Sequence, residues 1–234
     1  MSAHPPASPE PAPGSATASA APDPRVWSRR NMARLYDLLV IHGTYRWLWG
    51  CPQQRVAALY AAAIQAGDRV LEVGPGAGYF LDRIGRADLD VHLLDINDGP
   101  LHTTATRLAR YRPATHLHNA VQPFPLEENS IDVAVLSMVL HCLPGSSIAE
   151  KTPVLDHIAT VVRPGGAFIG ATVLSSGVDT SSVGRTGSRY LNAKGIFHNS
   201  GDSLTDLTRV LHERFADVRL GVCGSVALWR VSTR

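Results

Sequence analysis

Lysine is almost absent from this chain of 234 residues, which has two lysines against 20 arginines. The formal net charge is only +2, whereas proteins that bind nucleic acid or anionic membranes carry clustered basic charge. We therefore expect neither a nucleic acid nor a membrane as a partner. The preference for arginine is typical of GC-rich coding and hints at a bacterial source.

Cysteine is also scarce, and its spacing argues against the usual cysteine-based frameworks. Cys51, Cys142 and Cys223 are odd in number, far apart and without a C-x-x-C motif, so we expect neither a disulfide framework nor a metal site. The longest apolar run covers residues 56–64, whereas a membrane-spanning helix needs about 20 apolar residues. These features favour a cytoplasmic protein in a reducing compartment.

The start of the chain differs in composition from the rest. Residues 1–24 contain seven prolines and seven alanines, and such a segment buries too little apolar surface to offset the entropy lost on folding. We expect this segment to be a disordered tail, and it lacks the basic start and apolar centre of a secretory signal. Residues 25–234 are expected to form one domain.

Beyond about residue 68, short segments rich in β-branched residues alternate with segments of helical periodicity. We expect strands at residues 70–73, 91–94, 115–118, 131–136, 167–174, 218–223 and 225–231. We expect helices at residues 52–65, 79–86, 99–111, 150–162 and 204–215. This alternation predicts an α/β fold with a doubly wound, mostly parallel sheet and helices on both faces. The last two strands meet at Gly224 and predict a C-terminal antiparallel hairpin.

Two further segments are expected to border a ligand site. Residues 25–66 have the apolar spacing of N-terminal helices, and we expect these helices to cover the site. Residues 175–188 contain ten serine, threonine or glycine residues, a composition that fits either a solvated loop or a mobile cover. The wider segment 175–203 is the candidate lid or insertion.

Polar or small residues follow four of the expected strands. Gly74, Asp95, Asn119 and Ser137 each lie where a strand is expected to end. Ligands of parallel sheets bind at the carboxyl ends of the strands. We therefore expect these four residues to border one ligand site.

A glycine-rich loop, residues 74–78 (GPGAG), follows the first of these strands and opens a helix. Glycines there let the backbone turn sharply and approach a ligand closely, and the N-terminus of the helix offers free N–H groups. Asp95 lies 21 residues after Gly74 at the end of the next strand, where a carboxylate can bind ribose hydroxyls. These features together predict a nucleoside site.

Two residues beside the loop decide which nucleoside fits. The large Tyr79 occupies the place of the third glycine of a dinucleotide-binding loop, and Glu72 lies two residues before Gly74. A carboxylate at this place would repel a pyrophosphate but would bind an ammonium group. The residues therefore predict a nucleoside that carries an amino-acid zwitterion, and they disfavour a nicotinamide-dependent oxidoreductase.

At this point the sequence resembles a known family. Over about residues 32–231, it is similar to the class I S-adenosylmethionine-dependent methyltransferases. The similarity lies in residues 70–78 (VLEVGPGAG), 93–97 (LLDIN), 119–126 (NAVQPFPL), 137–143 (SMVLHCL) and 163–166 (RPGG). Residues 195–197 and the closing strands are similar to a compact bacterial subgroup that acts on small molecules.

The resemblance implies a Rossmann-like, seven-stranded mixed sheet and S-adenosyl-L-methionine as the cofactor. Asn119 stands where many relatives have aspartate, and its amide oxygen can still accept a hydrogen bond from adenine. The residues to which the resemblance gives a cofactor-binding role are Glu72, Gly74, Pro75, Gly76, Gly78, Asp95, Ile96, Asn119, Ala120, Ser137 and Met138.

The implied reaction is in-line transfer of a methyl group to oxygen, nitrogen or carbon of a small molecule. The alternative is a protein that binds S-adenosylmethionine without methyl transfer, as a partner subunit or as the catalyst of a rearrangement. Residues 137–140 (SMVL) lack the Asn/Asp-Pro-Pro-aromatic tetrad of methyltransferases that act on amines of DNA or on protein glutamine. No proline precedes Cys142, and no aspartate ends the fourth strand as in catechol-type metal sites.

His141 is the candidate general base, because it follows the fourth strand by about one helical turn, near the expected methyl group. Tyr36, Tyr45 and His198 are the candidates for contact with the acceptor. For each of these residues, ordinary packing or capping is the alternative. The sequence leaves open whether the protein is a monomer or a homodimer.

Overall fold

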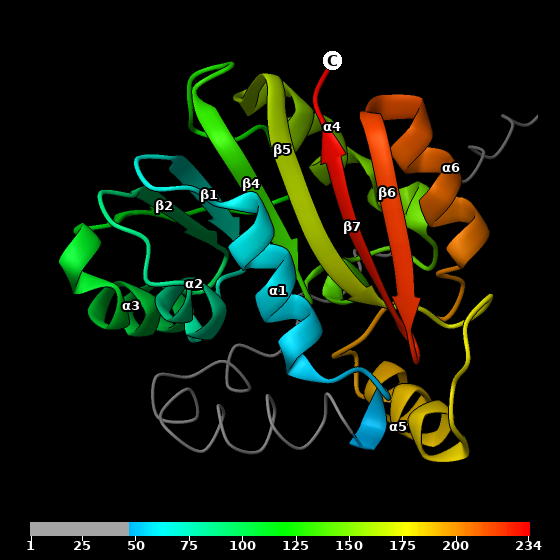
Figure 1. The fold of residues 1–234 in the computed structure, drawn as a ribbon. Helices are drawn as coiled ribbons and strands as arrows, with labels where there is room; N and C mark the ends of the chain where they lie inside the picture. Colours follow the sequence, from blue (N-terminus) through cyan, green and yellow to red (C-terminus); the bar gives the residue numbers. More distant parts are fainter. Residues whose placement is uncertain (1–46) are drawn as a thin grey trace, which may run out of the picture.

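The computed structural model describes residues 47–234, which form a seven-stranded sheet in the order β3-β2-β1-β4-β5-β7-β6 (Figure 1). The strands are β1 (Arg69–Val73), β2 (Asp90–Asp95), β3 (Ala114–Leu117), β4 (Ile131–Ser137), β5 (Val162–Val173), β6 (Ala216–Cys223) and β7 (Val226–Ser232). The first five strands are parallel, and β7 pairs antiparallel with both β5 and β6. The expected Rossmann-like mixed sheet is confirmed.

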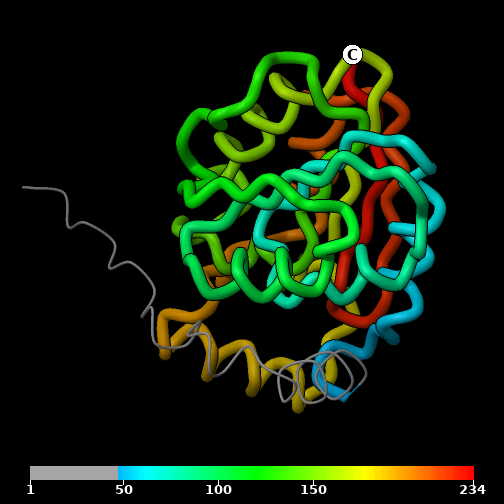
Figure 2. The backbone as a smooth tube through the Cα atoms, turned by 90° about the vertical axis from the view of Figure 1, so that its left-hand side faces the viewer, coloured from blue at the N-terminus to red at the C-terminus, as the bar shows by residue number. Residues whose placement is uncertain are grey.

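Helices cover both faces of the sheet. They are α1 (Gln53–Ala63), α2 (Tyr79–Arg83), α3 (Asp98–Arg107), α4 (Thr152–Val161), α5 (Ser182–Ala193) and α6 (Leu204–Arg214), with short 3-10 turns at Ala109–Tyr111, Leu140–Cys142 and Ile148–Lys151. Buried residues of α1, α2 and α3 form one apolar cluster with the sheet, and those of α4 and α6 form the other. Figures 1 and 2 show α5 apart from both layers, beside the first described residues.

The central strands carry the apolar runs that this layering requires. β1 and β4 have neighbours on both sides and helices on both faces, and nearly all their side chains are buried. Edge strand β6 instead alternates between less and more exposed side chains along most of its length. Continuous apolar runs are typical of parallel strands covered on both faces, whereas alternation is typical of a sheet edge with one wet face.

Several expected boundaries were wrong, for local reasons. The helix expected at 79–86 ends at Arg83, and Gly85 then has a positive φ of 58°, which ends α-helical geometry. The helix expected at 99–111 ends at Arg107 and continues only as a 3-10 turn. The strand expected at 167–174 begins already at Val162, and its pairing with β4 is irregular between Ile131 and Val133.

The prediction of a loop over residues 175–188 was wrong for the second half of this segment, because α5 begins at Ser182. The hydroxyl of Ser181 accepts a hydrogen bond of 3.0 Å from the backbone N–H of Gly184 and caps the helix. Gly184 and Gly187 lie against Leu48, which leaves no room for a side chain at either position. The composition therefore reflects a capped helix in close contact with the chain at Leu48. A lid function for residues 175–203 stays a prediction.

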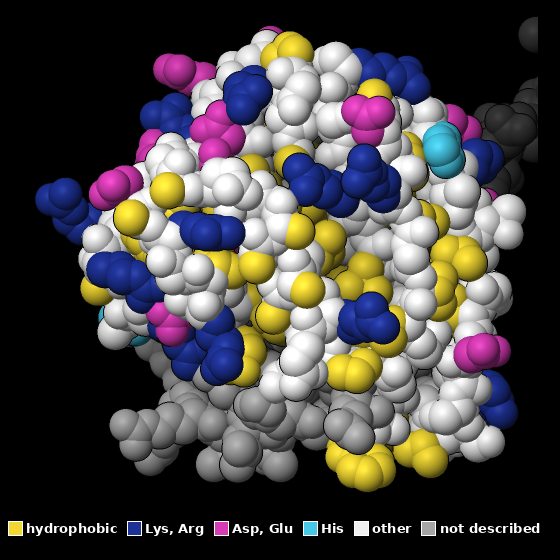
Figure 3. All heavy atoms as spheres, viewed as in Figure 1, with side chains coloured by type: hydrophobic (Ala, Val, Ile, Leu, Met, Phe, Trp, Pro, Cys, Tyr) yellow, Lys and Arg dark blue, Asp and Glu magenta, His cyan; other side chains and the backbone are white. Residues whose placement is uncertain are grey.

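On the face seen in Figure 3, cationic and acidic side chains are mixed. The structure also has exposed ion pairs, among them Arg69 with Asp90 and Arg110 with Asp82. Between residues 47 and 234, the structure has no helix with both the length and the apolar character needed to cross a bilayer. The expected tail at 1–24, the front helices up to residue 46, Tyr36 and Tyr45 lie outside the described residues.

Candidate active site

The parallel register brings the four expected strand ends to one edge of the sheet. Val73 of β1 pairs with Leu94 of β2 on one side and with Leu136 of β4 on the other. The next residues along these strands, Gly74, Asp95 and Ser137, therefore lie next to one another, and Asn119 follows the neighbouring β3. This register is the structural reason why these residues share one edge of the sheet.

The glycine loop is tightly enclosed at both ends and open in the middle. Gly74, Gly76 and Gly78 have φ values of 65°, 57° and 69°, which side chains rarely tolerate. A Cβ atom at Gly74 would lie 2.3 Å from Val139, and one at Gly78 would lie 2.7 Å from Thr104. A Cβ at Gly76 would have no atom of another described residue within 4 Å, its chain neighbours apart. The backbone at Gly76 therefore borders free space, as a ligand-binding loop requires.

Thr104 fixes this loop from α3. Its side chain is fully buried, and its hydroxyl donates a hydrogen bond of 3.0 Å to the carbonyl of Gly76. Loop and helix are 28 residues apart in sequence, so no local pattern indicates this bond. Thr104 follows the buried Leu101 by about one turn, so it lies on the buried face of α3.

Glu72 is a buried carboxylate with one oxygen unpaired. It is 4% exposed, and its Oε1 accepts a hydrogen bond of 2.8 Å from the hydroxyl of Tyr60 on α1. Its Oε2 is buried without a hydrogen-bond partner among the described residues. Burial raises the pKa of Glu72 to about 7, against the opposing effect of the Tyr60 hydrogen bond. A buried, unpaired carboxylate oxygen is costly, and a ligand that brings an ammonium group would remove this cost.

This raised pKa leads to a pH-dependent prediction. Glu72 binds a cation as the carboxylate, so affinity for S-adenosylmethionine should fall by up to about tenfold for each pH unit below 7. Glu72→Gln should weaken binding at pH 8 and largely remove this dependence. Calorimetric titration at about pH 6 and 8 measures both effects, with the exposed Glu128→Gln as the control.

The same substitution should stabilise the ligand-free protein. The native pKa of Glu72 lies above its ordinary value of 4.5, so the native state holds its proton more tightly than the unfolded state does. Stability therefore falls as the pH rises from about 4.5 to about 7 and stays lowered above that range. A Glu72→Gln protein that melts below the wild type at pH 8 without ligand would contradict this account.

Asp95 presents a carboxylate at the end of β2. The backbone N–H and the side-chain amide of Asn97 donate hydrogen bonds of 2.8 and 3.3 Å to its Oδ1. Burial raises the pKa of Asp95 to about 6, against the hydrogen bonds from Asn97. The neighbouring Ile96 is 50% exposed, and an apolar side chain in this place suits contact with a flat ring. The pair thus offers a polar contact for a sugar beside an apolar one for a base.

The remaining candidates for cofactor binding lie along the same edge. The side-chain oxygen of Asn119 accepts a hydrogen bond of 3.2 Å from the N–H of Val121, and Ala120 beside it is buried. The hydroxyl of Ser137 is buried without a partner among the described residues. Met138 has a positive φ of 59°, a conformation rare for a side chain of this size. The unpaired hydroxyl and the unusual backbone angle both lower stability at the end of β4.

His141 lies in the 3-10 turn after β4 and is 3% exposed. Its Nδ1 lies 3.1 Å from the hydroxyl of Thr172 and 3.2 Å from the backbone nitrogen of Val173, both on β5. Its ring centre lies 4.3 Å from that of Phe197. Burial, with a smaller contribution from the charge of Lys151, lowers the pKa of His141 to about 3.

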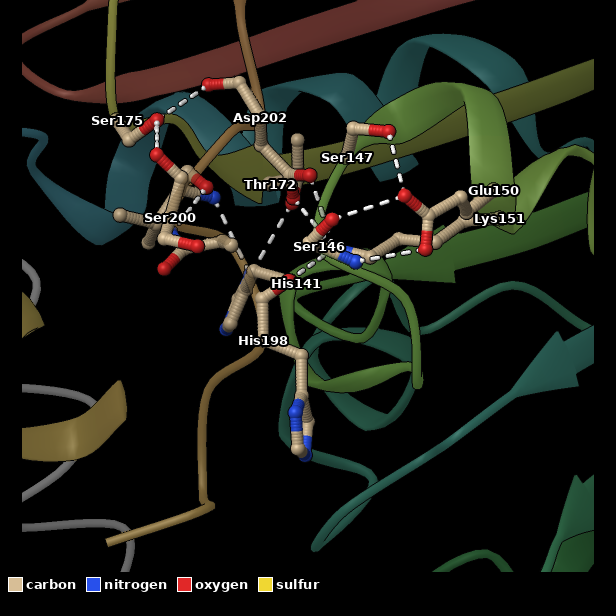
Figure 4. A network of polar contacts seen from close by, with 12 residues as sticks. His141, Ser146, Ser147, Glu150, Lys151, Thr172, Ser175, His198, Ser200 and Asp202 are labelled. Atoms are coloured by element: carbon tan, nitrogen blue, oxygen red, sulfur yellow. Dashed lines mark hydrogen bonds and ion pairs between the residues drawn. The ribbon is translucent and has the colours of Figure 1, made fainter. Parts of the chain in front are cut away.

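A buried ion pair holds the segment around His198 in place (Figure 4). Lys151 and Asp202 are both fully buried, and the Lys151 ammonium donates to both carboxylate oxygens of Asp202 at 2.7 and 2.9 Å and to the carbonyl of His198 at 2.8 Å. The backbone N–H of His198 donates to the carbonyl of His141 at 2.8 Å. The imidazole of His198 points away from this network. Sequence analysis missed this pair because its members are 51 residues apart.

Comparison with known proteins agrees with this geometry. Residues 71–168 match a methyltransferase domain model. Demethylluteothin O-methyltransferase from Streptomyces thioluteus is 42% identical over 206 residues, which cover 87% of this chain and 88% of the relative. The physcion biosynthesis cluster O-methyltransferase of Aspergillus chevalieri is 27% identical over 84% of this chain and 89% of its own length.

A solved structure shares the fold at low sequence identity. N-methyltransferase NodS from Bradyrhizobium japonicum, solved with S-adenosyl-L-homocysteine, superposes with a TM-score of 0.58 at 15% identity, over 77% of this chain and 87% of NodS. The expected family is therefore confirmed on three grounds: the domain match, the close relative and the shared fold. This chain belongs to the class I S-adenosylmethionine-dependent methyltransferases.

Proposed function

We propose that this protein transfers a methyl group from S-adenosylmethionine to a hydroxyl oxygen of a small molecule. The observation that carries the donor assignment is the unpaired Oε2 of buried Glu72, on the strand that leads into the open loop at Gly76. The choice of oxygen over nitrogen or carbon is supported by relatives named as O-methyltransferases, of which the Streptomyces protein is 42% identical.

Different residues of this chain bind different parts of S-adenosylmethionine. Glu72 binds the ammonium group of the donor, Asp95 accepts hydrogen bonds from the ribose, and Ile96 contacts the adenine ring. Gly76 lets the backbone approach the ligand without steric conflict. The donor supplies an activated methyl group on a positively charged sulfur. The protein then has to align the acceptor and exclude water, and such orientation supplies about 7–11 kcal/mol of barrier lowering in favourable cases.

Methyl-labelled S-adenosylmethionine tests this proposal. We expect label from the donor to enter an oxygen-bound methyl group when the protein is incubated with a small-molecule extract and the products are analysed by mass spectrometry and NMR. Label bound to nitrogen or carbon, or to macromolecules only, would overturn the oxygen assignment. Absence of any transfer by a protein that binds the donor would overturn the proposed reaction.

Asp95→Ala tests the binding site separately. Each hydrogen bond lost from a charged group is worth about 1.5–3 kcal/mol, so donor affinity should fall by about tenfold or more. The matched control is Asp90→Ala at the opposite end of the same strand, where the carboxylate makes an exposed ion pair with Arg69, because exposed pairs contribute little. Unchanged affinity of Asp95→Ala by calorimetry would contradict the assignment of the ribose contact.

A further inference from the structure

The hydrogen bonds of His141 fix the position of its proton. A backbone N–H only donates, and the N–H of Val173 points at Nδ1 of His141 at 3.2 Å. Nδ1 must therefore accept, which leaves the proton of the neutral ring on Nε2. The hydroxyl of Thr172 lies 3.1 Å from the same nitrogen and holds the ring from the same side. Neither contact involves Nε2.

The groups around the ring keep it neutral. The charged neighbour is the Lys151 ammonium, and Asp202 binds that ammonium rather than the imidazole. The adjacent Cys142 remains a neutral thiol, because burial raises its pKa to about 12. The imidazole of His198 points away from the network. No described carboxylate pairs with His141 to stabilise an imidazolium, and this agrees with the strongly lowered pKa of His141.

We propose that His141 acts through its Nε2–H as a hydrogen-bond donor to the acceptor oxygen, and not as the general base. A base would need a free electron pair on Nε2, and the contact from Val173 places the proton there instead. The inference rests on the proposed function, because it takes oxygen as the atom that is methylated. It changes the role expected for His141 from the sequence and, like that expectation, takes His141 as a residue of the acceptor site.

This role selects a class of acceptor. A donor at the oxygen favours its anionic form, so the acceptor suited to His141 is a phenol or an enol, which ionises readily, rather than an aliphatic alcohol. The hydroxyl proton leaves to water before transfer. The oxyanion then forms a bond to the methyl carbon as the bond from that carbon to sulfur breaks, with its electron pair remaining on sulfur. No proton is passed to His141 in this sequence.

NMR of isotope-labelled imidazole nitrogens tests the tautomer without any turnover. The His141 signals are assigned by their loss in His141→Gln and are recorded with and without S-adenosylhomocysteine. We expect the Nε2–H tautomer and no titration between about pH 6 and 9. An Nδ1–H tautomer, or protonation of the ring near neutral pH, would overturn the inference even if the protein proves to be an O-methyltransferase.

Kinetics with paired variants test the donor role. The amide of His141→Gln can still donate a hydrogen bond, whereas His141→Phe cannot. A hydrogen bond to a charged oxygen is worth about 1.5–3 kcal/mol, so at a pH below the pKa of the acceptor the Phe variant should hold about tenfold less of the acceptor in its anionic form. Its kcat should fall accordingly, and the kcat of the Gln variant should fall much less. Equal losses of kcat in both variants, with circular dichroism spectra unchanged, would favour His141 as a general base and would contradict the donor role. The half-buried His157, which contacts the carbonyl of Val121 outside this network, provides the control variant His157→Gln.

The acceptor class is tested with named probes. We expect the protein to methylate 4-hydroxy-6-methyl-2-pyrone, 1-naphthol or 4-nitrophenol in preference to benzyl alcohol, with methyl-labelled donor as the readout. Benzyl alcohol methylated as fast as the others, or no member of the acidic panel methylated, would overturn the acceptor class. Label found on nitrogen or carbon of a natural acceptor would instead overturn the proposed function and leave the tautomer result intact.

Discussion

Gly76→Val should abolish detectable binding of S-adenosylmethionine while the protein remains folded. The φ of Gly76 is 57°, and a Cβ atom there enters space in which no atom of the other described residues lies within 4 Å, its chain neighbours apart. Within residues 47–234, the valine side chain therefore meets no group that must move, but it fills the volume through which the donor would approach the backbone. Calorimetric titration measures the binding, and circular dichroism measures the fold.

A matched variant separates this steric effect from backbone strain. Gly85 has nearly the same φ, 58°, and a Cβ there also has no such described neighbour within 4 Å, but the residue lies beyond the far end of α2. A left-handed conformation costs a non-glycine residue about 1–2 kcal/mol, so both valine variants should lose similar stability. Only Gly76→Val should lose donor binding. Equal binding by the two variants would show that the loop is not the donor site.

Asp202→Ala should lower the free energy of unfolding by about 3–5 kcal/mol, because it leaves the ammonium of Lys151 buried without its counter-charge. Both side chains of the pair are 0% exposed, so water does not replace the lost contact. Urea unfolding measures the loss. Glu213→Gln is the control, since its ion pair with Arg209 on α6 is exposed and should contribute at most about 1 kcal/mol.

The double variant Lys151→Met with Asp202→Leu distinguishes a pair needed for stability from one needed for geometry. Replacement of both charges by apolar groups of similar size is often neutral or stabilising, so this protein should regain most of the stability lost by Asp202→Ala. The double variant also lacks the hydrogen bond that Lys151 donates to the carbonyl of His198. If the pair of Lys151 and Asp202 also positions the segment around His198, the kcat of the double variant should stay low even when its stability is restored. Loss of stability equal to that of Asp202→Ala would contradict the buried-charge explanation.

The strand pattern and the glycine loop could be predicted because their causes are local. Strands covered on both faces need unbroken apolar runs, and β1 and β4 have them in the sequence. The loop at Gly74, Gly76 and Gly78 needs residues that tolerate positive φ. By contrast, α5 was missed because its serine-rich sequence is typical of a loop, and contact with Leu48 from a distant part of the chain favours the helix.

By itself, the sequence determined the order of the seven strands and of the helices other than α5, the glycine loop and the presence of acidic residues where β1 and β2 end. The tertiary structure decided which groups those residues meet. Tyr60 reaches Glu72, Thr104 reaches the loop, and the backbone of Val173 reaches His141, across 12, 28 and 32 residues of sequence. Hydrogen bonds act over about 3 Å, so charge state and proton position depend on neighbours that only the folded chain brings within that distance.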